Sequence, residues 1–317
     1  MTKWLLIIDG GATKTACAVV HADSGEIQFI KTASGSNYQA IGVENALEIL
    51  QALLTHVRGF LQQQTTQKIS VATFAMAGID SLRDRDIVTT IVNQAITTQQ
   101  LDIDTLIIEN DAEATLYGVT AGQAGALLIA GTGAIAYASD GKQNIVRAGG
   151  WGHRAGDEGS GYWLGQEVVR AIFKMEDGRG EPTLLKNAVF NYLRIQHATE
   201  LATWLFRPSY TNAQLAKMGA FLAEATAKND TCAIQISTRA AHELVLLACA
   251  VLKQINYSGE VFTLYCNGGA IKHNPFILHT FTKEMTSMYP KIRISLCQQA
   301  PIEYIIKRTK MEASQNS

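Results

Sequence analysis

The sequence predicts an α/β protein built from two similar halves. Its 317 residues correspond to about two domains of ~100–200 residues each. A series of three strands, with a glycine-rich turn between the first two, occurs twice along the chain. Each series is followed by helices and further strands, an order that is typical of α/β folds.

Composition limits the class of protein before any motif is considered. Hydrophobic residues make up 47% of the chain, which supplies packed cores and is far from the composition of a disordered chain. Charged residues make up 17% and the net charge is −1, whereas nucleic-acid-binding domains normally carry a basic excess or cluster. We therefore expect folded domains and no nucleic-acid partner.

The first half opens with three consecutive strands. They are expected at 4–8, 15–21 and 26–32, with a glycine turn at 9–11 and a second turn at 23–25. The elements expected after them are, in order, a helix over 43–61, a strand over 70–76, a helix near 83–95 and a strand over 105–108.

The second half repeats this order. Its first three strands are expected at 126–130, 134–139 and 143–148, with a glycine turn at 131–133 and a hairpin turn at 140–141. The elements expected after them are a helical region from 161 to about 253 and two strands at 261–266 and 292–296. The duplication predicts a domain over 1–117 and a domain over 118–300 that contains a helical insertion at about 183–250. A protein with two such lobes is expected to bind ligands in the cleft between them.

Three features of the sequence indicate where in the cell the protein is located. The uncharged run 114–139 is interrupted by glycines and threonines, so it predicts a strand and turns, not a membrane helix. The apolar run 4–8 meets Asp9 too soon for the apolar region of a signal peptide. The five cysteines contain no C-x-x-C pair, which disfavours a disulfide framework or a cysteine-only metal site. We expect a cytoplasmic protein with no membrane partner.

The first glycine turn carries groups suited to phosphate. Gly10 and Gly11 let backbone N–H groups approach an anion, and Thr13 and Lys14 add donors. Asp9 would repel phosphate, so its expected role is to hold Mg²⁺ through water. The alternative is an ordinary hairpin with a polar turn. The segment is not a Walker loop, because it lacks that pattern and leads into a strand.

The second glycine turn occupies the equivalent place in the duplicate. Gly131, Thr132 and Gly133 begin a G-x-G-x-x-A pattern, which also occurs in dinucleotide-binding folds. That fingerprint must open a helix, and the turn at 140–141 comes too soon for one. A second phosphate-binding hairpin is the better interpretation.

Four further segments match one family in chain order. They are Ser34-Gly35-Ser36-Asn37 with Ile41-Gly42, then Asn110-Asp111-Ala112, then the glycine-rich segment 149–163, and finally Asn267-Gly268-Gly269. With the two hairpins they resemble the N-acetylglucosamine kinases of the BadF/BadG/BcrA/BcrD-type ATPase family, within the actin-like ATPase and sugar kinase superfamily. The matches run from residue 4 to about 272. The resemblance implies two duplicated ribonuclease-H-like domains around a central cleft, with the helical insertion in the second.

The resemblance implies ATP-dependent phosphorylation of the 6-hydroxyl of N-acetylglucosamine. Phosphoryl transfer to a hydroxyl needs positioning, a metal and an acceptor for the proton. Asp111 follows an apolar strand at the domain boundary, and the resemblance assigns it as the general base. Its alternative role is to cap a helix over 112–117.

The resemblance also assigns the remaining site residues. The residues implied to contact the sugar or its phosphate are Asn37, Thr132, Gly150, Trp151 and Asp157, with Glu158, His153 and Arg154 as further candidates. The residues implied to bind ATP are Gly10, Gly11, Thr13, Lys14, Gly131, Thr132, Gly133, Gly268 and Gly269. ATP and Mg²⁺ are the expected cofactors, an amino sugar is the expected substrate, and a homodimer is one expected assembly.

Two features depart from the family. Ala134 replaces the serine usual after Gly-Thr-Gly, which removes one hydroxyl donor worth ~0.5–1.5 kcal/mol. The C-terminal helix, expected at 301–310 and joined to the first domain in relatives, is bulkier and more basic here. Pro301 suits its start, and the tail 311–317 is expected to be disordered.

Other functions stay open on the sequence. Glucosamine kinase is a close alternative, because the segment 34–44 also resembles that relative. An ATP-driven activator with a shared iron–sulfur cluster would need a cysteine in a glycine-rich loop, and Cys266 is the one candidate by sequence. A sugar sensor without catalysis is disfavoured, because both Asp9 and Asp111 are present.

Overall fold

The computed structural model describes residues 3–142 and 144–315. The chain divides into two compact units. Unit 1 consists of Met1–Gln123 with Gln298–Ser317, and unit 2 consists of Ala124–Cys297. The C-terminal segment therefore returns to the unit in which the chain begins.

Unit 1 is built on a five-stranded sheet with the order β3-β2-β1-β4-β5. Its strands are β1 (Trp4–Gly10), β2 (Lys14–His21), β3 (Ile27–Ser34), β4 (Ile69–Met76) and β5 (Ile103–Glu109). β1, β2 and β3 pair antiparallel, whereas β4 and β5 run parallel to β1. The central strand β1 is almost wholly buried, which explains its unbroken apolar sequence.

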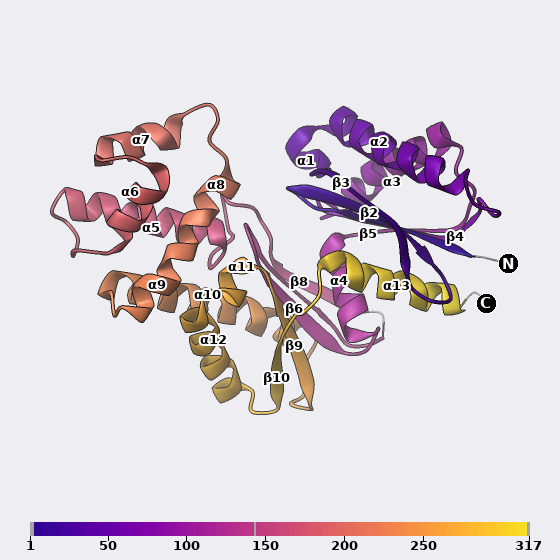
Figure 1. The fold of residues 1–317 in the computed structure, drawn as a ribbon. Coiled ribbons are helices and arrows are strands. Elements are labelled where there is room, and N and C mark those ends of the chain that lie inside the picture. The colour runs from indigo at the N-terminus through magenta and orange to yellow at the C-terminus, as the bar shows by residue number, and fades with distance from the viewer. Residues whose placement is uncertain (1–2, 143, 316–317) are drawn as a thin grey trace. The chain divides into compact units, whose positions relative to one another are not determined.

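Helices cover both faces of this sheet (Figure 1). One face packs against α2 (Val43–Leu61) and α3 (Leu82–Gln99), and the other against α4 (Asp111–Thr120) and α13 (Pro301–Gln315). Alternate residues of β1 enter the two cores, because successive side chains of a strand point to opposite faces. A short helix, α1 (Tyr38–Ile41), precedes α2.

Unit 2 repeats the topology of unit 1. Its strands are β6 (Gly125–Ala130), β7 (Ala134–Ser139), β8 (Ile145–Gly149), β9 (Phe262–Asn267) and β10 (Ile292–Leu296). The order is β10-β9-β6-β7-β8, with β6, β7 and β8 antiparallel and β9 and β10 parallel to β6. Read from the other edge, this is the order of unit 1. The predicted duplication is confirmed.

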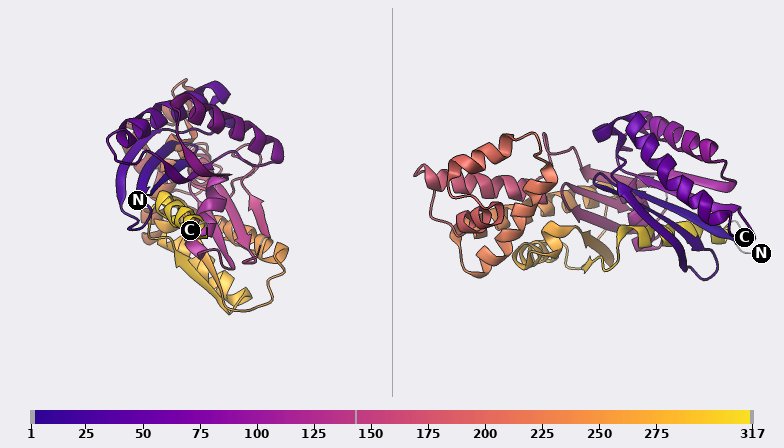
Figure 2. Two further views of the ribbon diagram at one scale, coloured as in Figure 1. Left: turned by 90° about the vertical axis from the view of Figure 1, so that its right-hand side faces the viewer. Right: turned by 45° about the horizontal axis from the view of Figure 1, so that its top comes forward.

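The helices of unit 2 form one large core with its sheet. α5 (Gly161–Glu176), α10 (Thr231–Gln254) and α12 (Pro275–Met288) belong to it, and the short α11 (Gly269–Lys272) follows β9. Between α5 and α10 the chain forms α6 (Leu185–Leu193), α7 (Ala198–Phe206), α8 (Asn212–Ala216), the 3₁₀ turn η1 (Lys217–Ala220) and α9 (Phe221–Ala227). These elements gather beside α5 (Figure 2, right).

Among the described residues, α10 is the one helix whose length and composition would allow it to cross a membrane. Of its most apolar window, 44% is buried inside the structure. Its buried residues, including Leu244, Ala248 and Val251, belong to the core of unit 2. Packing within unit 2 is therefore sufficient to account for its apolar composition.

Several predicted boundaries coincide with observed ones. The helix over 43–61 and the strands over 134–139 and 292–296 are α2, β7 and β10. The uncharged run 114–139 forms the end of α4, β6, the glycine hairpin and β7, as its glycines predict. β8 begins at Ile145, and Gln143, where the sequence predicts its start, lies outside the described residues.

The C-terminal tail differs from the prediction. The prediction that 311–317 is disordered is wrong for residues 311–315, because α13 continues to Gln315. Glu312 forms an ion pair of 3.0 Å with Arg308, and Ala313 packs beside the core under α13. The Met311 side chain reaches Gly122, where an added Cβ would lie 3.3 Å from its Cε. These contacts extend the helix beyond what its apolar pattern indicates.

Candidate active site

The two candidate catalytic carboxylates of unit 1 lie at one edge of its sheet. Asp9, near the end of β1, pairs in register with Ala75 of β4, which pairs with Glu109 of β5. β5 ends at Glu109, and Asp111 follows after one residue, Asn110. The carboxyl ends of parallel strands meet at the same edge, which is where α/β folds usually bind ligands.

Asn110, not Asp111, caps α4. The Asn110 side chain accepts hydrogen bonds from the N–H groups of Ala112 (2.8 Å) and Glu113 (3.4 Å), and it donates to the carbonyl of Ile79 (3.3 Å). Asp111 is the first helical residue, and its Oδ1 accepts from the N–H of Ala112 at 3.0 Å. The alternative that Asp111 serves as the cap is therefore wrong, because its neighbour satisfies the helix end.

Both carboxyl groups have raised pKa values, and Asp9 contributes to the shift of Asp111. Burial, the nearby charge of Asp9 and, to a smaller degree, that of Asp80 raise the pKa of Asp111 to about 7, although the N–H of Ala112 opposes this. Burial also raises the pKa of Asp9 to about 6, against the positive charge of Lys14. Neighbouring acids with raised pKa values are characteristic of functional sites.

Asp80 is a residue that the sequence analysis missed. It comes shortly after the end of β4. Asp9 lies near the end of β1 and Asp111 just after β5, so all three acids lie at the carboxyl edge of the parallel strands. Its negative charge contributes to the raised pKa of Asp111. The same rule that places the other two acids could have found it.

The first glycine turn joins β1 to β2 and is closed by the N–H of Gly11 donating to the carbonyl of Lys14 (3.0 Å). The segment after β3 lies directly on this turn, since a Cβ added at Gly35 would come within 2.2 Å of the Ala12 carbonyl oxygen. Gly10 is equally enclosed, with an added Cβ 2.5 Å from the sulfur of Met76. Thr13 and Lys14 are exposed at the tip of the turn, where a phosphate could reach them.

Asn37 is held near the same edge. Its side chain accepts from the N–H of Gln39 at 2.9 Å and so caps α1. It also lies against Gly78, where an added Cβ would meet its Oδ1 at 2.5 Å. Gln39 donates to the carbonyl of Gly78 (3.2 Å), and the hydroxyl of Tyr38 donates to Asp84. The segments after β3 and β4 are thus bound to each other around Asn37.

The second glycine turn, over 131–133, connects β6 to β7 as an antiparallel hairpin. The N–H of Gly131 donates to the carbonyl of Gly133 at 2.9 Å. No helix follows the turn, so the dinucleotide-binding alternative is wrong. Thr132 is exposed at the tip of this hairpin.

Asp157 is placed against this hairpin. The N–H of Ala134 donates to its Oδ1 at 3.1 Å, and the residue is 9% exposed. Burial raises the pKa of Asp157, and Glu158 adds to this, while the Ala134 N–H and His153 oppose it.

The rest of the segment 149–163 is more open. Trp151 is 71% exposed, with the guanidinium carbon of Arg147 4.8 Å from its ring centre. Gly150 has φ of +71° and donates its N–H to the carbonyl of Ala134 at 2.9 Å. The ring of His153 packs edge-on against Tyr162. The other two candidates, Glu158 and Arg154, are exposed.

Gly268 and Gly269 join β9 to α11. Gly268 has φ of +95°, and an added Cβ would lie 2.3 Å from the carbonyl of Ala130. This turn therefore lies against the start of the second hairpin, a closeness that only glycine permits. Asn267 accepts from the N–H of Gly268 at 2.9 Å and from the Nζ of Lys272 at 3.4 Å. The glycine motif and the hairpin form one surface of unit 2.

The structure thus gathers the predicted residues into two groups, one in each unit. The group of unit 1 comprises Asp9, Gly10, Gly11, Thr13, Lys14, Asn37 and Asp111. The group of unit 2 comprises Gly131, Thr132, Gly133, Gly150, Asp157, Gly268 and Gly269, with Trp151 beside them.

The acids of unit 1 fit a magnesium ion. Among the described residues, no three His, Cys, Asp or Glu side chains cluster as a self-sufficient metal site. Asp9 and Asp111 offer hard carboxylate oxygens, and the charge of Asp9 raises the pKa of Asp111, so a positive charge beside these acids would favour their ionised forms. Mg²⁺ typically takes one or two carboxylates, several waters and substrate phosphates. The donor set suits a metal that arrives with a nucleotide.

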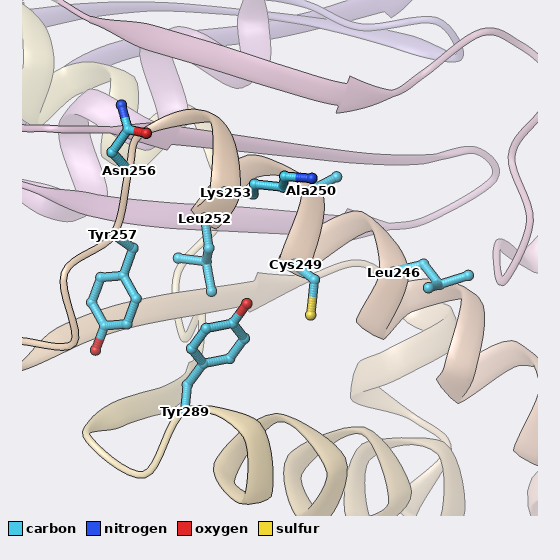
Figure 3. A pocket seen from close by; sticks show the side chains of 8 residues that line it. All are labelled: Leu246, Cys249, Ala250, Leu252, Lys253, Asn256, Tyr257 and Tyr289. Carbon is cyan, nitrogen blue, oxygen red and sulfur yellow. The ribbon is translucent and has the colours of Figure 1, made fainter.

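A pocket of about 410 Å³ lies elsewhere in unit 2, between α10 and the end of α12 (Figure 3). Leu252, Tyr257, Tyr289 and the Cys249 thiol line it. It contains none of the predicted site residues.

Comparisons with known proteins agree with these motifs. The model of the BadF/BadG/BcrA/BcrD ATPase family matches residues 8–303. The N-acetylmuramic acid/N-acetylglucosamine kinase of Clostridium acetobutylicum is 29% identical over 292 residues, which cover 92% of this chain and 93% of that protein. The N-acetyl-D-glucosamine kinase of Dictyostelium discoideum is 27% identical over 304 residues, covering 93% and 94% of the two chains.

A solved structure shares the fold. It is a Chromobacterium violaceum protein provisionally named an N-acetylglucosamine kinase, and it superposes with a TM-score of 0.74 at 22% identity, covering 97% of this chain and 99% of that one. This likeness confirms the predicted fold class. The family model matches most of the chain, from β1 to α13, and the chain therefore belongs to the BadF/BadG/BcrA/BcrD ATPase family.

Proposed function

We propose that this protein is an ATP-dependent kinase that phosphorylates the 6-hydroxyl of N-acetylglucosamine. The observation that carries the proposal is the position of Asp111, at the carboxyl edge of the parallel strands and with a pKa of about 7. A carboxylate with this pKa is suited to accept a proton near neutral pH. Both curated relatives carry N-acetylglucosamine kinase in their names.

The proposed reaction gives a role to each group of predicted residues. Asp111 accepts the hydroxyl proton while the sugar oxygen forms a bond to the γ-phosphorus of ATP, and the bond to the β–γ bridging oxygen breaks to release ADP. The exposed tips of the two glycine turns supply donors for the phosphates, with Thr13 and Lys14 on one and Thr132 on the other. When bound, Mg²⁺ would neutralise charge on the phosphates, and Asp9 is the residue placed to hold it through water.

The sugar is assigned to Asn37, Gly150, Trp151 and Asp157. The open ring of Trp151 offers an apolar face, and Asn37 and Asp157 offer polar groups held in fixed positions. Such a combination is common in sugar sites, because the hydroxyl groups need partners and the ring needs an apolar surface.

An activator with a shared iron–sulfur cluster fits less well. Cys266 is completely buried at the end of β9, and burial raises the pKa of its thiol. It therefore presents no thiolate at the surface for a cluster shared between subunits.

A sugar panel tests the proposal. Purified protein with ATP and Mg²⁺ should release ADP with N-acetylglucosamine, and its kcat/KM for that sugar should exceed that for glucosamine and for N-acetylmuramic acid. The 6-deoxy analogue of N-acetylglucosamine should be inert. No sugar-stimulated ADP release with any member would contradict a kinase, and phosphorylation of the 6-deoxy analogue would contradict the assigned position.

A further inference from the structure

The sugar segment and the nucleotide hairpin of unit 2 are joined by hydrogen bonds, and Asp157 is at their centre. We infer that Asp157 is a positioning residue for nucleotide binding, because it fixes the hairpin through the Ala134 N–H, in addition to its proposed contact with the sugar. This inference rests on the proposed function for the identity of the two ligands. The geometry that supports it lies within unit 2 alone.

The first support is the fit of the carboxylate against the hairpin. Oδ1 of Asp157 accepts a hydrogen bond from the N–H of Ala134 at 3.1 Å. Asp157 itself is only 9% exposed. A Cβ added at Gly133 would lie 3.0–3.2 Å from the carboxylate atoms. The carboxylate thus covers the last turn residue and holds the first residue of β7.

The second support is that the neighbours of Asp157 bind the same hairpin. The N–H groups of Gly161 and Tyr162 donate to the carbonyls of Gly131 (2.7 Å) and Thr132 (3.2 Å). On the other side, the N–H of Gly150 donates to the carbonyl of Ala134 at 2.9 Å. The hairpin is therefore bonded to both ends of the sugar segment.

The third support is the backbone of Asp157 itself. Its φ is +66°, in the left-handed region that non-glycine residues rarely adopt. Such conformations cost free energy and persist where the surrounding structure fixes them. A glycine would take this conformation without cost, so the side chain is what the position requires.

The consequence concerns both ligands. Because the Ala134 N–H is donated to Asp157, it is not a donor to phosphate, and the hairpin needs the carboxylate to keep its shape. A sugar that contacts Asp157 would therefore change the stability of the nucleotide hairpin. Sugar and nucleotide binding should be coupled, and the coupling should be the same in both directions.

Two substitutions separate this role from the sugar contact. Asp157→Asn keeps an oxygen that can accept the Ala134 N–H, and asparagine tolerates left-handed φ. Asp157→Gly removes the acceptor and relaxes the backbone. Asp140→Asn is the matched control, because Asp140 accepts backbone N–H groups in the β7–β8 turn at 2.8 Å and 3.3 Å without belonging to either site.

The test is the affinity for ADP, measured by calorimetry on the sugar-free protein with Mg²⁺. We expect Asp157→Gly to weaken ADP binding about tenfold, and Asp157→Asn and Asp140→Asn to stay within about twofold of the wild type. Hydrogen exchange of the peptide that contains 131–139 should accelerate in Asp157→Gly and not in Asp157→Asn. Wild-type ADP affinity and exchange in Asp157→Gly would overturn the inference.

The outcome is separate from that of the sugar panel. If no sugar is phosphorylated but Asp157→Gly still loosens the hairpin and weakens ADP binding, the proposed function fails and the positioning role stands. If the sugar panel succeeds and both Asp157 variants bind ADP as tightly as the wild type, the positioning role fails alone.

Discussion

At the scale of single residues, the candidate site depends on how each acid is held. Asn110 satisfies the first N–H groups of α4, and Asp111 shares the N–H of Ala112 at 3.0 Å, against 2.8 Å to Asn110. An acid that served as the cap would be committed to the helix end and would have a lowered pKa. Because Asn110 caps the helix, Asp111 can stand at the helix start and still be available as a base.

Replacing Asp111 tests its role directly. We expect Asp111→Asn to lower kcat by about 10²–10⁴, because general base catalysis contributes that much, while ADP affinity stays within about twofold. Asp86→Asn, at an exposed position of α3, is the control and should keep wild-type turnover. Steady-state kinetics and calorimetry measure the two quantities. Turnover near the wild-type value in Asp111→Asn would refute the assignment.

The pH dependence of turnover follows from the same acid. Because burial and Asp9 raise the pKa of Asp111 to about 7, kcat/KM for ATP should rise with pH up to that region and then level off. Asp80→Asn removes a negative charge that disfavours ionisation of Asp111, so the rise should move to lower pH. A rise that stays in place or moves to higher pH in this variant would contradict the electrostatic argument.

At the scale of elements, α13 is fastened to unit 1 by polar as well as apolar contacts. Its Thr309 hydroxyl lies 2.8 Å from that of Thr73 on β4, with both residues fully buried. The guanidinium of Arg308 pairs with Glu109 at 3.3 Å and stacks on Tyr117 at 4.3 Å. Glu109 ends the strand that leads to Asp111, so this helix supports the edge of the sheet that carries the candidate base.

Breaking that pair should destabilise the protein more than breaking a surface pair. Arg308→Leu removes the ion-pair partner of the mostly buried Glu109, which typically costs about 3–5 kcal/mol. The double variant with Glu109→Leu should recover part of this loss. Lys68→Ala, which breaks an exposed pair of 2.7 Å with Asp104, should cost far less, because water screens that pair. Urea unfolding measures all three, and equal losses for Arg308→Leu and Lys68→Ala would contradict the burial argument.

Elements with a regular pattern could be predicted from the sequence, and those defined by tertiary contacts could not. The periodicity of 43–61 and the alternation around the two glycine turns predicted α2 and both hairpins, since local pattern determines them. The extension of α13 to Gln315 is accompanied by a contact between Met311 and Gly122, which is far from the tail in the sequence. The bond between Asp157 and Ala134 likewise joins residues 23 positions apart, a contact that no local pattern predicts.

At the scale of the whole molecule, the raised pKa values of Asp9 and Asp111 make stability depend on pH and on ligands. A carboxyl whose folded pKa is above its unfolded value of 3.8 contributes most to stability below that value, and the contribution is lost as pH rises through the folded value. For these two acids the loss falls between about pH 4 and pH 7. The ligand-free protein should therefore become less stable as the pH rises from 4.5 to 8.

Ligand binding should reverse this loss. A cation bound with nucleotide favours the ionised acids, so the rise in Tm caused by ADP with Mg²⁺ should be larger at pH 8 than at pH 5.5. In Asp9→Asn the Tm of the ligand-free protein should fall less between these pH values, because one of the two carboxylates is gone. Differential scanning calorimetry at several pH values measures both effects. A ligand-induced Tm shift that is larger at pH 5.5 would mean that these carboxylates do not face the bound metal and nucleotide.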